Sequence, residues 1–98
     1  MNLQAMMKQA QKLQKDMMSE KKKIDEMEFV GKSSLVTVTV KGTKEVASVK
    51  INAENIEKDE IEMLEDMILV ATNEANKQVD KVTEEKMGKY TQGMPGLF

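Results

Sequence analysis

The chain has 98 residues, with no cysteine, histidine or tryptophan, and a net charge of −2. Without cysteine it has no disulfide framework, thiolate nucleophile or cysteine-based zinc site. Without histidine it lacks the usual general base at neutral pH and the commonest metal ligand. The composition therefore argues against an enzyme, and the length predicts one domain over residues 1–98.

The charges are unevenly distributed along the chain. Residues 1–23 hold six lysines and two acids, a net charge of +4, and residues 31–51 carry +3. Residues 52–66 hold seven acids and one lysine, a net charge of −6. The pattern is therefore a basic N-terminal arm followed by an acidic middle segment.

The first 27 residues predict one helix with Asn2 as its N-cap. Apolar residues recur at alternating spacings of three and four, a heptad pattern that predicts a packing seam. Glu20 is the only polar member, and it marks either the point where the helix leaves its partner or a register-setting contact. The many methionines suit an adaptable peptide groove, but the regular spacing favours a dimer or helix-hairpin seam. The seam residues are Leu3, Met6, Ala10, Leu13, Met17, Glu20, Ile24 and Met27.

The middle of the chain predicts three strands. Phe29-Val30 starts a short strand that is terminated by residues 31–34. Residues 35–40 alternate strictly and are rich in β-branched side chains. Val36, Val38 and Val40 are expected to face the core. After a turn at residues 42–43, residues 46–51 form the return strand, with Val49 and Ile51 inward.

A second helix is predicted from a capping box at Asp59 and Glu62 to Met87, with Gly88 as its C-cap. Its expected stripe is Ile61, Leu64, Ile68, Ala71, Ala75 and Val82. Residues 91–98 are expected to be a flexible tail. The order is α-β-β-β-α, an α+β two-layer domain with a three-stranded antiparallel sheet.

One chain cannot cover both the seam of the first helix and the far side of the second, so we expect a homodimer. A five-residue stretch of the second helix is apolar on all sides, which a helix tolerates when it is buried on several sides. The candidate dimer-interface residues are therefore Met67, Ile68, Leu69, Val70 and Ala71.

The sequence offers little support for a catalytic, metal-binding or membrane function. Glu62, Glu65 and Asp66 could form a paired-carboxylate or metal site, but a solvated face at a helix N-terminus explains them better. The longest apolar run, residues 67–71, is far shorter than the roughly 20 residues that span a bilayer. We expect no cofactor, metal, small-molecule substrate or membrane partner, and a cytoplasmic location.

The lysines are the candidate binding residues. Four of them lie opposite the seam of the first helix, and a second group lies late in the second helix. Such a stripe could track phosphates, although lysines on a helix are more often only a solvated surface. The candidate DNA-binding residues are Lys8, Lys12, Lys15, Lys21, Lys22, Lys23, Lys77, Lys81, Lys86 and Lys89.

Four segments in order resemble the YbaB/EbfC family of bacterial nucleoid-associated proteins. They are residues 6–14 (MMKQAQKLQ), 35–42 (LVTVTVKG), 62–75 (EMLEDMI followed by NEA) and 85–89 (EKMGK). Two places depart from the family pattern: residues 31–34 replace a loop usually rich in glycine, and Ala53-Glu54 replaces an acid–proline pair.

The resemblance implies a homodimer that binds double-stranded DNA with little sequence preference, alters its conformation and is located in the nucleoid. It also implies no catalysis and no cofactor. The alternative is a coiled-coil-like interaction or adaptor module that does not bind DNA directly.

Overall fold

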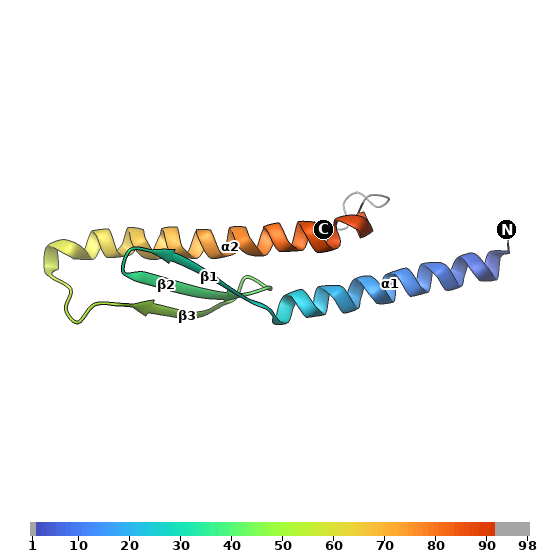
Figure 1. The fold of residues 1–98 in the computed structure, drawn as a ribbon, viewed down its shortest axis with the longest axis horizontal. Helices are drawn as coiled ribbons and strands as arrows, with labels where there is room; N and C mark the ends of the chain where they lie inside the picture. The colour runs from blue at the N-terminus through green and yellow to red at the C-terminus, as the bar shows by residue number, and fades with distance from the viewer. Residues whose placement is uncertain (1, 92–98) are drawn as a thin grey trace.

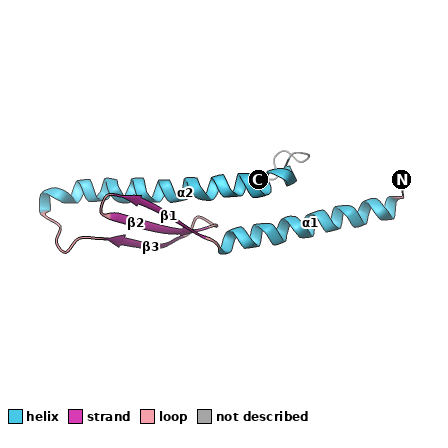
Figure 2. Ribbon diagram, viewed as in Figure 1, coloured by secondary structure: helices cyan, strands magenta, loops and turns pink. Residues whose placement is uncertain are grey.

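The computed structural model describes residues 2–91, which form a long helix, a three-stranded antiparallel sheet and a second long helix (Figures 1 and 2). The strand order is β1-β2-β3. This confirms the predicted α+β architecture. The elements are α1 (Leu3–Glu26), β1 (Glu28–Ser33), β2 (Val36–Lys41), β3 (Val46–Ile51), the 3-10 turn η1 (Lys58–Glu60) and α2 (Ile61–Thr91).

The core lies between α2 and the first two strands. Val36, Val38 and Val40 point toward α2 and are fully buried, as their alternation predicted. Gly31 lets the two layers approach closely, because a Cβ there would lie 2.0 Å from the backbone oxygen of Ala71. β1 therefore continues through Gly31 to Ser33 and does not end at Val30 as expected, since this glycine serves packing and not a turn.

β3 is not buried in the core as predicted. All of its residues are exposed, including Val49 and Ile51, which the sequence pattern placed inward. Their cross-strand partners are Val38 and Val36, so they lie on the core side of the sheet. They stay exposed because α2 packs over β1 and β2 and leaves the third strand uncovered (Figure 1).

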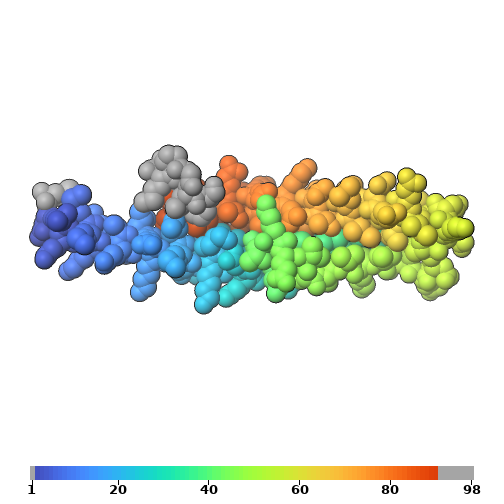
Figure 3. All heavy atoms as spheres, turned by 180° about the vertical axis from the view of Figure 1, so that it is seen from behind, coloured from blue at the N-terminus to red at the C-terminus, as the bar shows by residue number. Residues whose placement is uncertain are grey.

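α1 contacts the rest of the molecule only near its C-terminal end. Ile24 is fully buried against Met87 and Tyr90, and Met17 packs partly against them, while the first four turns project as an arm (Figures 1 and 3). The described molecule measures 70 × 21 × 14 Å. Its radius of gyration is 19.4 Å, against about 13 Å for a compact chain of this length.

Gly42 sets the direction of this arm. Its N–H donates to the Met27 carbonyl at 3.1 Å, and a Cβ at this position would lie 1.8 Å from the Ile24 oxygen. The β2–β3 turn and the end of α1 are therefore in direct backbone contact.

The bounds of α2 differ from those predicted. The helical turn begins at Glu57, whose N–H donates to the Glu60 carboxylate at 3.2 Å, and not at Asp59. At the other end, α2 continues through Gly88 to Thr91, so Gly88 is not a C-cap and Thr91 is not part of a tail. Residues 92–98 of the expected tail lie outside the described residues.

The buried stripe of α2 differs from the predicted one at two positions. Val79 is a core residue that the predicted stripe omitted, while Ile61 is exposed. The N-cap of α1 is as predicted, since the Asn2 side chain accepts a hydrogen bond from the Gln4 N–H at 3.0 Å. Within residues 2–91, neither helix is long and apolar enough to cross a membrane.

Replacing Gly42 with alanine should destabilise the protein, because backbone atoms of α1 must move to admit the new Cβ. We expect a loss of about 1–3 kcal/mol in the free energy of unfolding, measured by urea denaturation at equal protein concentration. Gly88→Ala is the matched control, because its Cβ would meet nothing within 4 Å. That variant should gain up to about 1 kcal/mol, and equal effects of the two substitutions would contradict the role of Gly42.

Candidate nucleic-acid interface

The lysines of α1 form a regular stripe on the side opposite its apolar seam. Lys8, Lys15 and Lys22 follow one another at seven-residue intervals, about 10 Å apart along a helix. Lys12 lies beside them, and all four are exposed. None has an ion-pair partner among residues 2–91. Because α1 projects from the body, nothing within the described chain covers these ammonium groups.

Of the two remaining lysines of α1, only Lys21 is less available. Lys21 is half-buried, and its ammonium group lies 2.6 Å from the Asp25 carboxylate. Lys23 is exposed in the last turn. Lys21 and Lys22 also line a shallow hollow with Met17, Met18, Asp25 and Met87, where the two helices meet. The positive charge on α1 that is free to bind an anion therefore lies on the stripe opposite the seam and on Lys23.

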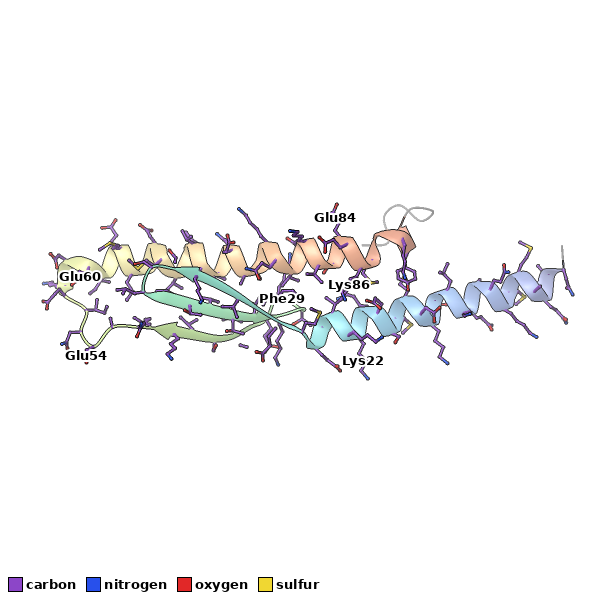
Figure 4. All side chains as sticks on the ribbon, in the orientation of Figure 1. Lys22, Phe29, Glu54, Glu60, Glu84 and Lys86 are labelled. Carbon is purple, nitrogen blue, oxygen red and sulfur yellow. The ribbon has the colours of Figure 1, made fainter. Side chains whose placement is uncertain are left out.

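The lysines of α2 do not extend this stripe. Lys77, Lys81, Lys86 and Lys89 are exposed, but residues 74–89 also hold four acids, so their net charge is zero. The Lys89 ammonium group lies 5.0 Å from the centre of the Tyr90 ring. Figure 4 shows Lys86 on the side of α2 toward α1 and Lys22 on the far side of α1. The two predicted lysine groups therefore belong to different surfaces.

A third group of lysines, which the sequence pattern did not reveal, lies on the open face of the sheet. Lys32, Thr37 and Lys50 form one row across the three strands, on the face turned away from α2. Both lysines are exposed, about 10 Å apart across two strand spacings. The net charge of +3 over residues 31–51 was the available signal, but the strand register was needed to place the two lysines together.

Opposite charges lie at opposite ends of the long molecule. The segment with a net charge of −6, residues 52–66, covers the β3–α2 connection and the first turns of α2. Figure 4 shows Glu54 and Glu60 at this end, and Figure 1 shows the N-terminus of α1 at the other. A polyanion would therefore be repelled from the acidic end and attracted to the arm.

The candidate metal site is not supported by the structure. Glu62, Glu65 and Asp66 line an open surface hollow together with Lys58 and Ile61. Within residues 2–91, no three carboxylate side chains lie close enough together to hold a metal ion.

The five candidate dimer residues have different surroundings. Ala71 is fully buried against the sheet, and Met67 and Ile68 are half-buried in the same core. Leu69 and Val70 are 60% and 53% exposed. Leu69 and Val70 are therefore the most exposed of the five.

The chain is similar to known proteins along almost its whole length. A model of the YbaB/EbfC DNA-binding family matches residues 1–94. A nucleoid-associated protein of Lactococcus lactis subsp. cremoris (strain MG1363) is 48% identical over 97 residues, covering 97% of this chain and 98% of that protein. A nucleoid-associated protein of Enterococcus faecalis is 39% identical over 98 residues, covering 98% of this chain and 94% of that protein. One of Lactobacillus acidophilus is 44% identical over 96 residues, covering 96% and 86%. These matches include every helix and strand.

Proposed function

The chain belongs to the YbaB/EbfC DNA-binding family, and from this membership we propose that it binds double-stranded DNA as a homodimer, mainly through phosphate contacts. In this role it alters DNA conformation and contributes to nucleoid organisation and gene regulation. The family is defined by DNA binding and not by catalysis. An adaptor module that never contacts DNA is not favoured by this membership.

The exposed stripe of Lys8, Lys12, Lys15 and Lys22 is the observation that carries the proposal. A duplex carries one negative charge per roughly 1.7 Å of its axis, so a stripe of this length meets several phosphates. The chain has no arginine, and arginine is the residue best suited to bidentate contacts with guanine. The expected mode is therefore attraction to the DNA backbone, with little reading of sequence.

The uncovered side of β3 is the surface that we assign to the homodimer. Val46, Val49 and Ile51 lie on the core side of the sheet, beside valines that α2 covers, but are themselves exposed. A contiguous exposed apolar surface of this kind is typical of an interaction site. A second copy of the chain would cover these side chains.

One flank of α2 continues this apolar surface. Asp80 on that flank binds Lys44, just before β3, with its carboxylate 2.7 Å from the ammonium group. Asn76 lies one turn before Asp80, and Leu69 lies two turns before Asn76, so both share the flank. The Asn76 Oδ1 atom is buried and has no hydrogen-bond partner among the described residues. Buried polar atoms are rarely left unpaired, so a donor from a partner subunit would complete this site.

DNA affinity should depend steeply on salt. If Lys8, Lys12 and Lys15 of both subunits neutralise roughly six phosphates, log K should fall against log salt with a slope of about −5. We expect the triple glutamine variant to lose most of this slope in fluorescence anisotropy titrations, whatever the DNA sequence. Lys58→Gln, at the acidic end, should leave affinity nearly unchanged and serves as the location control. Binding that is independent of salt would contradict the proposal.

Lys21 and Lys22 offer an internal comparison. Lys22→Gln should weaken binding more than Lys21→Gln, because Lys21 is already paired with Asp25. Each substitution removes one lysine from each subunit, and each lysine–phosphate interaction lost should lower the affinity roughly fivefold at about 0.15 M salt. Asp25→Asn should strengthen binding by releasing Lys21. Equal reductions in affinity for the two lysine variants, with no gain for Asp25→Asn, would show that the ion pair does not prevent Lys21 from binding DNA.

The dimer assignment can be tested by sedimentation. The wild-type chain should sediment at twice its 11.1 kDa mass, and Val49→Glu or Leu69→Glu should reduce this to the monomer, because each places a charge in an apolar interface. Val70→Glu is the matched control, since Val70 is adjacent and exposed but lies on the opposite flank of α2. Dissociation by Val70→Glu alone would place the interface elsewhere.

A further inference from the structure

The apolar seam of α1 is covered at one end and exposed at the other. Met17 and Ile24 pack against Met87 and Tyr90 of α2, so the covered part of the seam packs against a helix. Toward the N-terminus no described element reaches the seam. The exposed members, which we call the arm seam, are Leu3, Met6, Ala10 and Leu13.

From Asn2 to Gln14, the residues that flank the arm seam carry no charge, and the next flanking residue is Asp16, which would face Asn2 of an antiparallel arm. With Leu3 and Met6 as the two apolar positions of the first heptad, the flanking positions are occupied by Asn2, Met7, Gln9 and Gln14. The three lysines at seven-residue intervals occupy the outermost position of each heptad. Two arms could therefore pack through their seams with no like charges facing each other at the edges and with their lysines outward.

The sizes of the seam residues favour antiparallel packing. In an antiparallel pair Leu3 faces Leu13 of the other arm, and Met6 faces Ala10, so each large side chain in the middle meets a small one. In a parallel pair Ala10 would face Ala10 and leave a gap, while Met6 would face Met6. Interiors without gaps are more stable, so the antiparallel arrangement fits this sequence better.

Antiparallel packing also determines which molecules can pair. It places the two protein bodies at opposite ends of the paired arms, separated by the part of each α1 that leads to its body. The arm seam spans about 15 Å of a helix about 36 Å long. Two chains whose bodies are already in contact cannot adopt this arrangement, so the paired arms must come from different dimers.

We propose that the arm seam is a second self-association surface, which joins one dimer to another through an antiparallel pair of α1 helices. This inference rests on the homodimer of the proposed function. The lysine stripes of two paired arms point in opposite directions, so a joined pair of dimers would hold two DNA segments together. The surface itself requires no DNA, which allows the two ideas to be tested separately.

Sedimentation over a range of protein concentrations, without DNA, tests the surface. The wild-type protein should pass from dimer to tetramer as concentration rises, and Leu13→Gln should weaken this step at least tenfold while remaining a dimer. Met18→Gln is the matched control, because Met18 is 63% exposed on α1 but lies outside the seam. It should associate like the wild type.

Other outcomes would overturn the inference. A wild-type protein that remains a dimer at every concentration has no such surface. If Leu13→Gln forms tetramers like the wild type, association uses another surface; if it becomes a monomer, the seam is the dimer interface itself. None of these outcomes contradicts DNA binding by the lysine stripe, because its residues are the same in every variant. A salt-independent DNA titration would instead contradict the proposed function and leave the arm seam intact.

Cross-linking tests the direction of the pair, since the chain has no cysteine of its own. A mixture of Leu3→Cys and Leu13→Cys proteins should form mixed disulfides under mild oxidation, because only antiparallel arms bring these positions within bonding distance. Each variant alone should remain uncross-linked. Disulfides between identical variants, with none in the mixed pair, would show parallel arms and overturn the proposal.

Discussion

The position of α1 depends on one contact between two backbones. Gly42, in the turn after β2, lies directly against the last turn of α1 and donates a hydrogen bond to Met27. Only a residue without a side chain fits there. Since Ile24 is buried beside this contact, the base of the helix is held and its first four turns project. The exposure of both the lysine stripe and the arm seam follows from this geometry.

A second close approach determines which part of the sheet remains uncovered. Gly31 of β1 meets Ala71 and Ala75 of α2, where three small residues bring helix and strand together. This contact draws α2 over β1, and the Gln78 side chain donates to the Val30 carbonyl at 2.8 Å on the same strand. A single helix cannot also cover β3. The contact that builds the core therefore also leaves the apolar side of β3 exposed.

The sequence predicted the elements and their faces better than it predicted what covers those faces. The alternation of Val36 to Val40 and the heptads of α1 define an apolar side by periodicity alone, and the burial of the three valines was confirmed. The exposure of Val49 was missed because periodicity gives the direction of a side chain but not the position of α2 across three strands. Gly31 and Gly88 were misread because a glycine looks the same in a turn, a close contact and a helix.

For the candidate DNA-binding lysines too, the sequence predicted what a single helix determines and missed what the packing of several strands determines. Helical geometry was enough to place Lys8, Lys12 and Lys15 on one exposed stripe. The pairing of Lys21 with Asp25 has a sequence signal, because residues four apart are neighbours on a helix. The row that joins Lys32 and Lys50 has no such signal, since it depends on the register of three strands.

The separation of charge and apolar residues on α1 explains how one helix can serve two contacts. Lysines at the flanking heptad positions would repel each other when two arms pack, whereas lysines at the outermost position are separated by the full width of both helices. Phosphates bound to these lysines would reduce even the remaining long-range repulsion. Binding of DNA would therefore favour pairing of the arms, and by thermodynamic reciprocity paired arms would bind DNA more tightly than single ones. The heptad position of the lysines, more than their number, is what couples the two contacts.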